Sequence, residues 1–81
     1  MPEQMNGENL LGRITTDQNV LCGKPVIKGT RISVEMILEK LAKNMNAEDV
    51  MSQYDIEEQD IRAALTYAQM TLANEEVYDV I

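Results

Sequence analysis

The 81-residue sequence contains no histidine, no tryptophan, no phenylalanine and only one cysteine, Cys22. Without histidine, neither a Ser-His-Asp nor a Cys-His catalytic arrangement can form. A single cysteine excludes a disulfide within one chain, and the usual zinc ligand sets cannot be assembled. Three tyrosines are too few and too scattered to form a stacking platform for single-stranded nucleic acid. We therefore expect a non-enzymatic protein with no cofactor, no metal and no small-molecule substrate.

Long apolar runs are also missing. No stretch approaches the roughly 20 residues that a membrane-spanning helix needs, and no secretory signal opens the sequence. A lone cysteine fits a reducing compartment. These features predict a cytoplasmic protein without membrane contact, in which Cys22 is a small packed residue rather than a nucleophile.

Positive charge is scarce and unevenly placed. The net charge is −7, from seven cations and 14 acids. Residues 13–43 carry six of the cations and three acids, whereas residues 44–81 carry only Arg62 against nine acids. Such an acidic half repels phosphate backbones and attracts basic partners. The alternative is that it only keeps the protein soluble.

The length suits one domain, which would be marginally stable by itself. Small domains gain stability from disulfides, metals or a second subunit, and a two-fold dimer is the commonest assembly. We therefore expect a homodimer. Residues 1–12 show no hydrophobic period and predict a flexible N-terminal arm, while residues 13–81 form the single folded domain.

The first part of this domain is β-prone. Residues 13–16 form a short β-prone segment, and residues 26–32 predict a tight hairpin that reverses at Lys28 and Gly29. Gly29 supplies the positive φ that a short reversal requires.

Three amphipathic helices are predicted to follow, at about residues 34–44, 47–54 and 58–73. Ser33 and Asn46 are suitable N-caps for the first two. Apolar residues recur with helical spacing in each. The expected buried positions are Val34, Ile37, Leu38, Leu41, Ala42 and Met45, then Ala47, Val50, Met51 and Tyr54, then Ile61, Ala64, Leu65, Ala68 and Leu72. The fold class is therefore mainly α: a three-helix helix-turn-helix domain preceded by a short β-hairpin.

The run from Gly23 to Ser33, with Lys24-Pro25 near its start and Thr30-Arg31-Ile32 near its end, resembles the signature of a bacterial and archaeal family, the domain of unknown function 433 family. Arg13-Ile14-Thr15 and the segment from Asp60 to Ala68 follow the same plan. The likeness covers about residues 13–78. It implies a homeodomain-like helical fold.

Many members of that family look like antitoxins paired with PIN-like ribonuclease toxins. The resemblance thus implies a module that binds and neutralises such a toxin and represses its own operon as a dimer. Two positions depart from the family pattern. Cys22 stands where a small residue, often glycine, is usual, and Glu57 stands where Ser or Thr usually caps the last helix. Because Glu is a weaker N-cap, we expect that helix start to fray.

Two sets of residues are candidates for binding. An apolar tail, Val77, Tyr78, Val80 and Ile81, could add a helix or strand to a partner protein. The alternative is that this tail packs on the core or in the homodimer.

An alternative function is that of a dimeric transcriptional regulator that binds operator DNA and has no toxin partner. A third possibility is a structural protein-interaction subunit. The candidate DNA-binding residues are Lys24, Lys28 and Arg31 on the hairpin, and Arg62 on the last helix. The hairpin cations could equally be a solvated edge that blocks aggregation. Three acids, Glu57, Glu58 and Asp60, oppose DNA binding at the start of the last helix.

Overall fold

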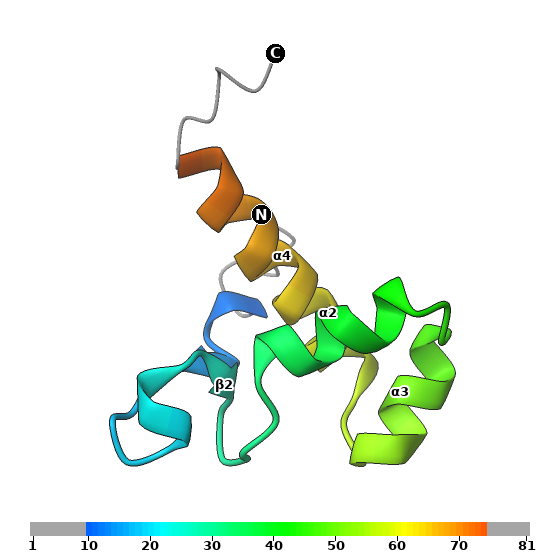
Figure 1. The fold of residues 1–81 in the computed structure, drawn as a ribbon, viewed down its shortest axis with the longest axis horizontal. Coiled ribbons are helices and arrows are strands. Elements are labelled where there is room, and N and C mark those ends of the chain that lie inside the picture. The colour runs from blue at the N-terminus through cyan, green and yellow to red at the C-terminus, as the bar shows by residue number, and fades with distance from the viewer. Residues whose placement is uncertain (1–9, 75–81) are drawn as a thin grey trace, which may run out of the picture.

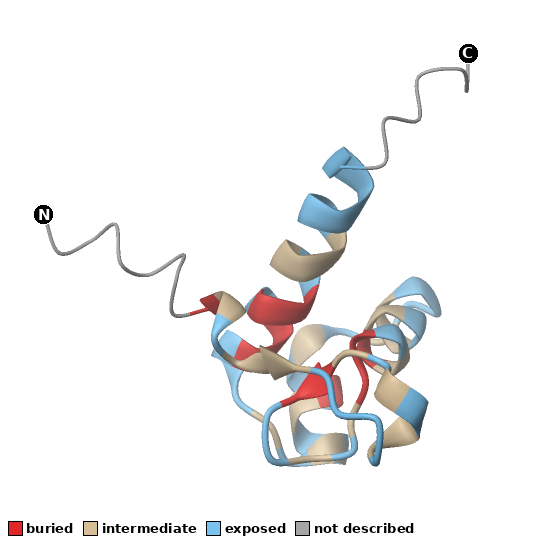
Figure 2. Ribbon diagram, turned by 90° about the vertical axis from the view of Figure 1, so that its left-hand side faces the viewer, coloured by how far each residue is buried: buried red, intermediate tan, exposed pale blue. Residues whose placement is uncertain are grey.

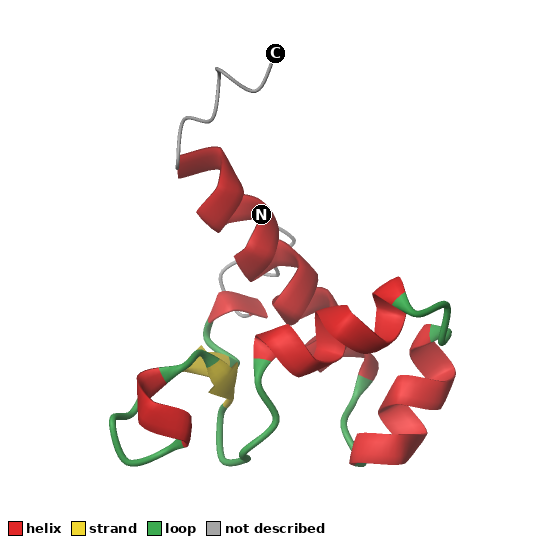
Figure 3. Ribbon diagram, in the orientation of Figure 1, coloured by secondary structure: helices red, strands yellow, loops and turns green. Residues whose placement is uncertain are grey.

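The computed structural model describes residues 10–74. In chain order the elements are strand β1 (Ile14–Thr15), the 3-10 turn η2 (Leu21–Gly23), strand β2 (Val26–Ile27), and helices α2 (Val34–Ala42), α3 (Ala47–Tyr54) and α4 (Glu58–Asn74). The two strands lie at one end of the molecule, and α3 lies at the other (Figures 1 and 3). The predicted fold class, three helices of helix-turn-helix type after a short β-hairpin, is confirmed.

The pairing within the hairpin differs from the prediction. Strand β2 pairs antiparallel with β1, with Ile14 opposite Ile27. With the segment that follows it, β2 forms only an isolated antiparallel bridge between Val26 and Ser33, next to a hydrogen bond from the Ile27 N–H to the Ile32 carbonyl at 2.9 Å. The chain does reverse at Gly29, whose φ is +80°, and the Thr30 side chain fastens the turn. Its hydroxyl donates to the Ile27 carbonyl at 2.7 Å and accepts from the Ile32 N–H at 2.9 Å. Because Ser33 also caps α2, this bridge is not extended into a strand.

The first two helices begin at the predicted caps. The Ser33 hydroxyl accepts from the Met36 N–H, and the Asn46 side chain accepts from the Asp49 N–H, both at 2.9 Å. Each bond satisfies a backbone donor that has no partner inside its helix. Helix α3 ends at Tyr54, and the next residue, Asp55, adopts a left-handed conformation with φ of 58°. That residue starts the turn into α4.

The core forms where the three helices and the hairpin meet. Its buried residues are Ile27, Val34, Ile37, Val50, Ile61 and Ala64. Ile37 and Val50 are completely buried. Each helix contributes to this cluster, so even α3, which has only eight residues, is held by packing rather than by its own helix-forming tendency.

Helix α4 differs from its predicted burial. Ile61 and Ala64 are buried as expected, and Ala63 is buried as well, but Leu65 and Leu72 are 47% and 59% exposed. The other structural elements cover the first half of this helix, and its second half projects beyond them, as the exposed turns in Figure 2 show. The apolar spacing therefore continues past the end of the core.

Two features near the N-terminus also differ from expectation. Leu10, within the segment predicted as an arm, is helical and only 8% exposed, so the folded region includes it. Cys22 is exposed rather than packed, and it has φ of 57° within η2. Such a left-handed conformation costs a residue other than glycine about 1–3 kcal/mol.

Candidate protein-binding surfaces

The four candidate DNA-binding residues are all exposed, but they do not form one patch with a single role. Lys24 is ion-paired, with its Nζ 2.9 Å from Glu35 Oε1, and the hydrogen bond to Glu35 raises the pKa of Lys24. Lys28 and Arg31 share the turn after β2. Arg62 lies on α4. The structure thus brings together only Lys28 and Arg31.

The candidate partner-binding residues of the tail, Val77, Tyr78, Val80 and Ile81, lie outside the described residues. Their role stays a prediction. Within residues 10–74, no helix has the length and apolarity needed to cross a membrane. The same part of the chain holds no group of three or more cysteine or acidic side chains placed to bind a metal ion.

The start of α4 is fastened by an ionic network that the sequence did not predict. Arg13 Nη1 donates to Asp60 Oδ1 at 2.9 Å and to Glu57 Oε1 at 3.0 Å. These hydrogen bonds, that to Asp60 first, raise the pKa of the Arg13 guanidinium. The other Asp60 oxygen accepts from the Glu57 N–H at 2.9 Å. Arg13 is therefore occupied in joining the segment before β1 to α4.

This network replaces the cap that Glu57 was expected to provide weakly. Asp60 stands three residues after Glu57 and reaches back to its N–H, as the third helical residue does in a capping box. The Glu57 side chain instead faces Arg13. The three-residue spacing could have indicated the Asp60 contact. The partner Arg13 lies 47 residues away from Asp60, and no local pattern could have identified it.

Exposed carboxylates lie at both ends of α3 and on the turn that leads into α4. They belong to Glu48, Asp49, Asp55, Glu57 and Glu58. The only Lys or Arg in residues 44–74 is Arg62. In a helix-turn-helix protein, the start of this last helix enters the major groove of DNA. Here the start of the last helix is acidic, which opposes contact with a phosphate backbone. We call this set of five carboxylates the acidic face.

An apolar groove of about 530 Å³ separates α2 from the second half of α4. We call it the α2–α4 groove. Its surface is almost entirely apolar, and its main lining residues are Val34, Leu38, Ala42, Tyr67, Ala68 and Leu72. Charged side chains stand only at its rim, where Lys24 pairs with Glu35 and Lys43 pairs with Glu39. The pair with Lys43 lowers the pKa of Glu39. The rim of the groove is therefore close to neutral.

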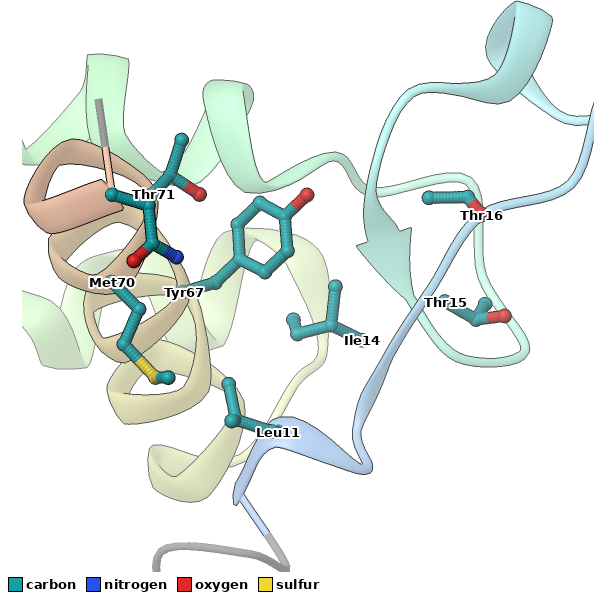
Figure 4. Close-up of a pocket in the computed structure, with 8 residues that line it drawn as sticks. Leu11, Ile14, Thr15, Thr16, Tyr67, Met70 and Thr71 are labelled. Carbon is teal, nitrogen blue, oxygen red and sulfur yellow. The ribbon is translucent and has the colours of Figure 1, made fainter.

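A second groove, of about 520 Å³, lies between β1 and the opposite side of α4 (Figure 4). Leu11 and Ile14 line one wall, and Met70 lines the other. The Tyr67 ring stands between α4 and β1 in this view, and Tyr67 contributes to the lining of both grooves. Both sides of the second half of α4 are therefore accessible.

Comparison with known families supplies the context for these surfaces. The family model described as "Protein of unknown function (DUF433)" matches residues 14–68. The chain belongs to this family. The comparisons with curated proteins and with solved structures found no match. The DUF433 match ends at Ala68, whereas α4 continues to Asn74, so the last exposed turns of α4 lie beyond it.

The backbone at position 22 adopts a conformation that suits glycine better than cysteine. A glycine there would adopt a φ of 57° without steric cost, whereas Cys22 is forced into it. Leu21, with φ of 51°, and Gly23, with φ of 88°, continue the left-handed turn on either side. The turn therefore accepts a cysteine only at the expense of backbone strain.

Proposed function

We propose that this chain is a non-enzymatic, antitoxin-like binding module that pairs with and neutralises a PIN-like ribonuclease toxin. The observation that carries the proposal is the acidic face on α3 and at the start of α4. A ribonuclease must present positive charge to its substrate, because phosphate contacts dominate binding to nucleic acids. Exposed carboxylates are complementary in charge to such a channel.

The physical mechanism is competition by charge and shape. Exposed carboxylates steer a basic partner toward this face and raise the rate of association. Once bound, the rigid turn between α3 and α4 would occupy the channel and exclude RNA. The Arg13 network supports this role, because it holds Glu57 and the first turn of α4 in place before the partner arrives. A preorganised surface loses less entropy on binding.

A second candidate function is a dimeric DNA-binding regulator, either alone or as autorepression of the toxin operon. It is favoured by Lys28 and Arg31, which are exposed on one turn. A dimer would present this turn twice, as DNA-binding β-ribbons do. The acidic face makes insertion of α4 into the major groove unfavourable, so this candidate depends on the turn. Lys28→Ala combined with Arg31→Ala should then abolish binding to promoter DNA.

The test of the first proposal begins with the partner. Native mass spectrometry of the tagged full chain from its own host should reveal a complex with the product of an adjacent gene, a basic protein. That partner, once separated, should cleave single-stranded RNA, and adding this chain should stop the cleavage. A partner without ribonuclease activity, or a ribonuclease that this chain leaves active, would refute the proposal.

Charge reversal then tests the acidic face. Glu58→Lys should weaken inhibition at least about tenfold, because an attractive contact becomes repulsive. The matched control is the double variant Gln18→Lys and Asn19→Lys, which changes the net charge by the same amount but lies in the exposed turn before η2. Equal loss of inhibition in both proteins would show that only overall charge matters. Full inhibition by Glu58→Lys would place the toxin on another surface.

A further inference from the structure

An apolar stripe on α4 extends out of the core and remains uncovered. Ile61, at its start, is buried, but Leu65, Ala68 and Leu72 continue with helical spacing along the same side of the helix. Leu65 is 47% exposed and Leu72 is 59% exposed. Large side chains of this kind on one helix face usually mark an interaction surface.

The groove beside this stripe is apolar, as the stripe is. The α2–α4 groove runs along Ala68 and Leu72 and is closed on its far side by Leu38 and Ala42. The same face therefore carries protruding leucine side chains and an apolar recess. A surface with both features can be complementary to itself, which is the requirement for a two-fold symmetric interface.

The charges around the face also favour a second copy. The rim acids Glu35 and Glu39 are paired with lysines of the same chain, so two rims can approach without strong repulsion. Arg62, the only lysine or arginine after Lys43 in the sequence, stands between the first two residues of the stripe, Ile61 and Leu65. A parallel pair of α4 helices would place Arg62 near Arg62 of the other copy, whereas an antiparallel pair keeps these two like charges apart.

We propose that two copies of this chain form a homodimer through this face. Their α4 helices run antiparallel and cross near Ala68, whose small side chain allows close approach. Leu65 of each copy packs beside Leu72 of the other at the mouth of the α2–α4 groove. The acidic face lies outside this interface and stays available to another partner, so the dimer does not depend on the proposed function.

The first test compares two exposed residues of the same helix. Leu72→Glu places a charge in the interface, whereas Met70→Glu places it on the side of α4 that faces the second groove. Sedimentation equilibrium of the full chain should show a dimer for the parent and for Met70→Glu. Leu72→Glu should raise the dissociation constant at least about tenfold. Circular dichroism should show unchanged helix content in both variants.

Several results would overturn the proposal. A parent protein that stays monomeric up to about 1 mM would exclude the dimer. Equal weakening by Leu72→Glu and Met70→Glu would exclude this interface. A monomer in which Leu72→Glu lowers the melting temperature much more than Met70→Glu would mean that the chain's own residues fill the groove.

Cross-linking tests the helix orientation in a Cys22→Ser background. Leu65→Cys and Leu72→Cys chains, differently tagged and mixed, should form a disulfide between the two variants. Two copies of the Leu65→Cys chain should not form a disulfide with each other. In the antiparallel pair the two residues 65 lie about 10 Å apart along the helices, the length of seven helical residues, which exceeds the reach of a disulfide. Efficient disulfides within each variant and none between them would show a parallel pair and overturn the arrangement.

Discussion

The two halves of α4 have similar apolar spacing but different environments. In the first half, Ile61, Ala63 and Ala64 are buried, and Asp60 is tied to Arg13. Leu65, at the middle of the helix, and Met70 and Leu72, in the second half, are exposed. The difference teaches that hydrophobic periodicity defines the apolar face of a helix but does not show how much of that face other elements bury. Within the described residues, α2, α3 and the hairpin are too short to cover the whole of α4.

The largest expected effect comes from removing side chains in each half. Ile61→Ala should lower the free energy of unfolding by about 2–5 kcal/mol, because it leaves a cavity in the core. Met70→Ala should cost well under 1 kcal/mol, because Met70 is 42% exposed. Urea unfolding of both variants at one protein concentration measures the contrast. Similar losses would mean that the second half is as tightly packed as the first.

A smaller effect is expected at the start of α4. Asp60→Ala should cost about 1–3 kcal/mol, because the Glu57 N–H and the Arg13 guanidinium lose their buried acceptor. The control is Glu58→Ala, an exposed acid in the same first turn, for which a much smaller loss is expected. Thermal unfolding followed by circular dichroism distinguishes them. If the two variants have the same melting temperature, the Arg13–Asp60 network does not stabilise the first half of α4.

The smallest effect is expected in the exposed half. Gln69→Gly should destabilise the helix locally by about 0.5–1 kcal/mol, so the last turns should unwind without loss of the core. Measured at low micromolar concentration, the far-ultraviolet signal should fall while the melting temperature changes little. A melting temperature that falls as far as in Asp60→Ala would show that the second half is coupled to the core.

Much of the fold could be predicted from local patterns. The caps Ser33 and Asn46 and the turn glycine Gly29 act within a few residues of themselves, so their structural roles were predicted correctly. The predicted hairpin of residues 26–32 is present only as a turn with one antiparallel bridge, between Val26 and Ser33. The strand partner of β2 was missed, because Ile14 lies 13 residues before Ile27 and no local pattern indicates that pairing. The acidic face was visible as a run of acids in the sequence, but its position around the turn into α4 was not.

The sequence by itself determined the approximate limits of α2, α3 and α4, the sign of the charge in each half, and the side of α4 that is apolar. The helix limits and the apolar side depend on spacing of 3.6 residues and on caps. Only the tertiary structure decided which apolar residues are buried, since burial depends on which elements reach a given turn. It also joined Arg13 to Asp60 and opened the α2–α4 groove beside Leu72. Contacts between residues far apart in the chain arise from packing, and no local pattern encodes them.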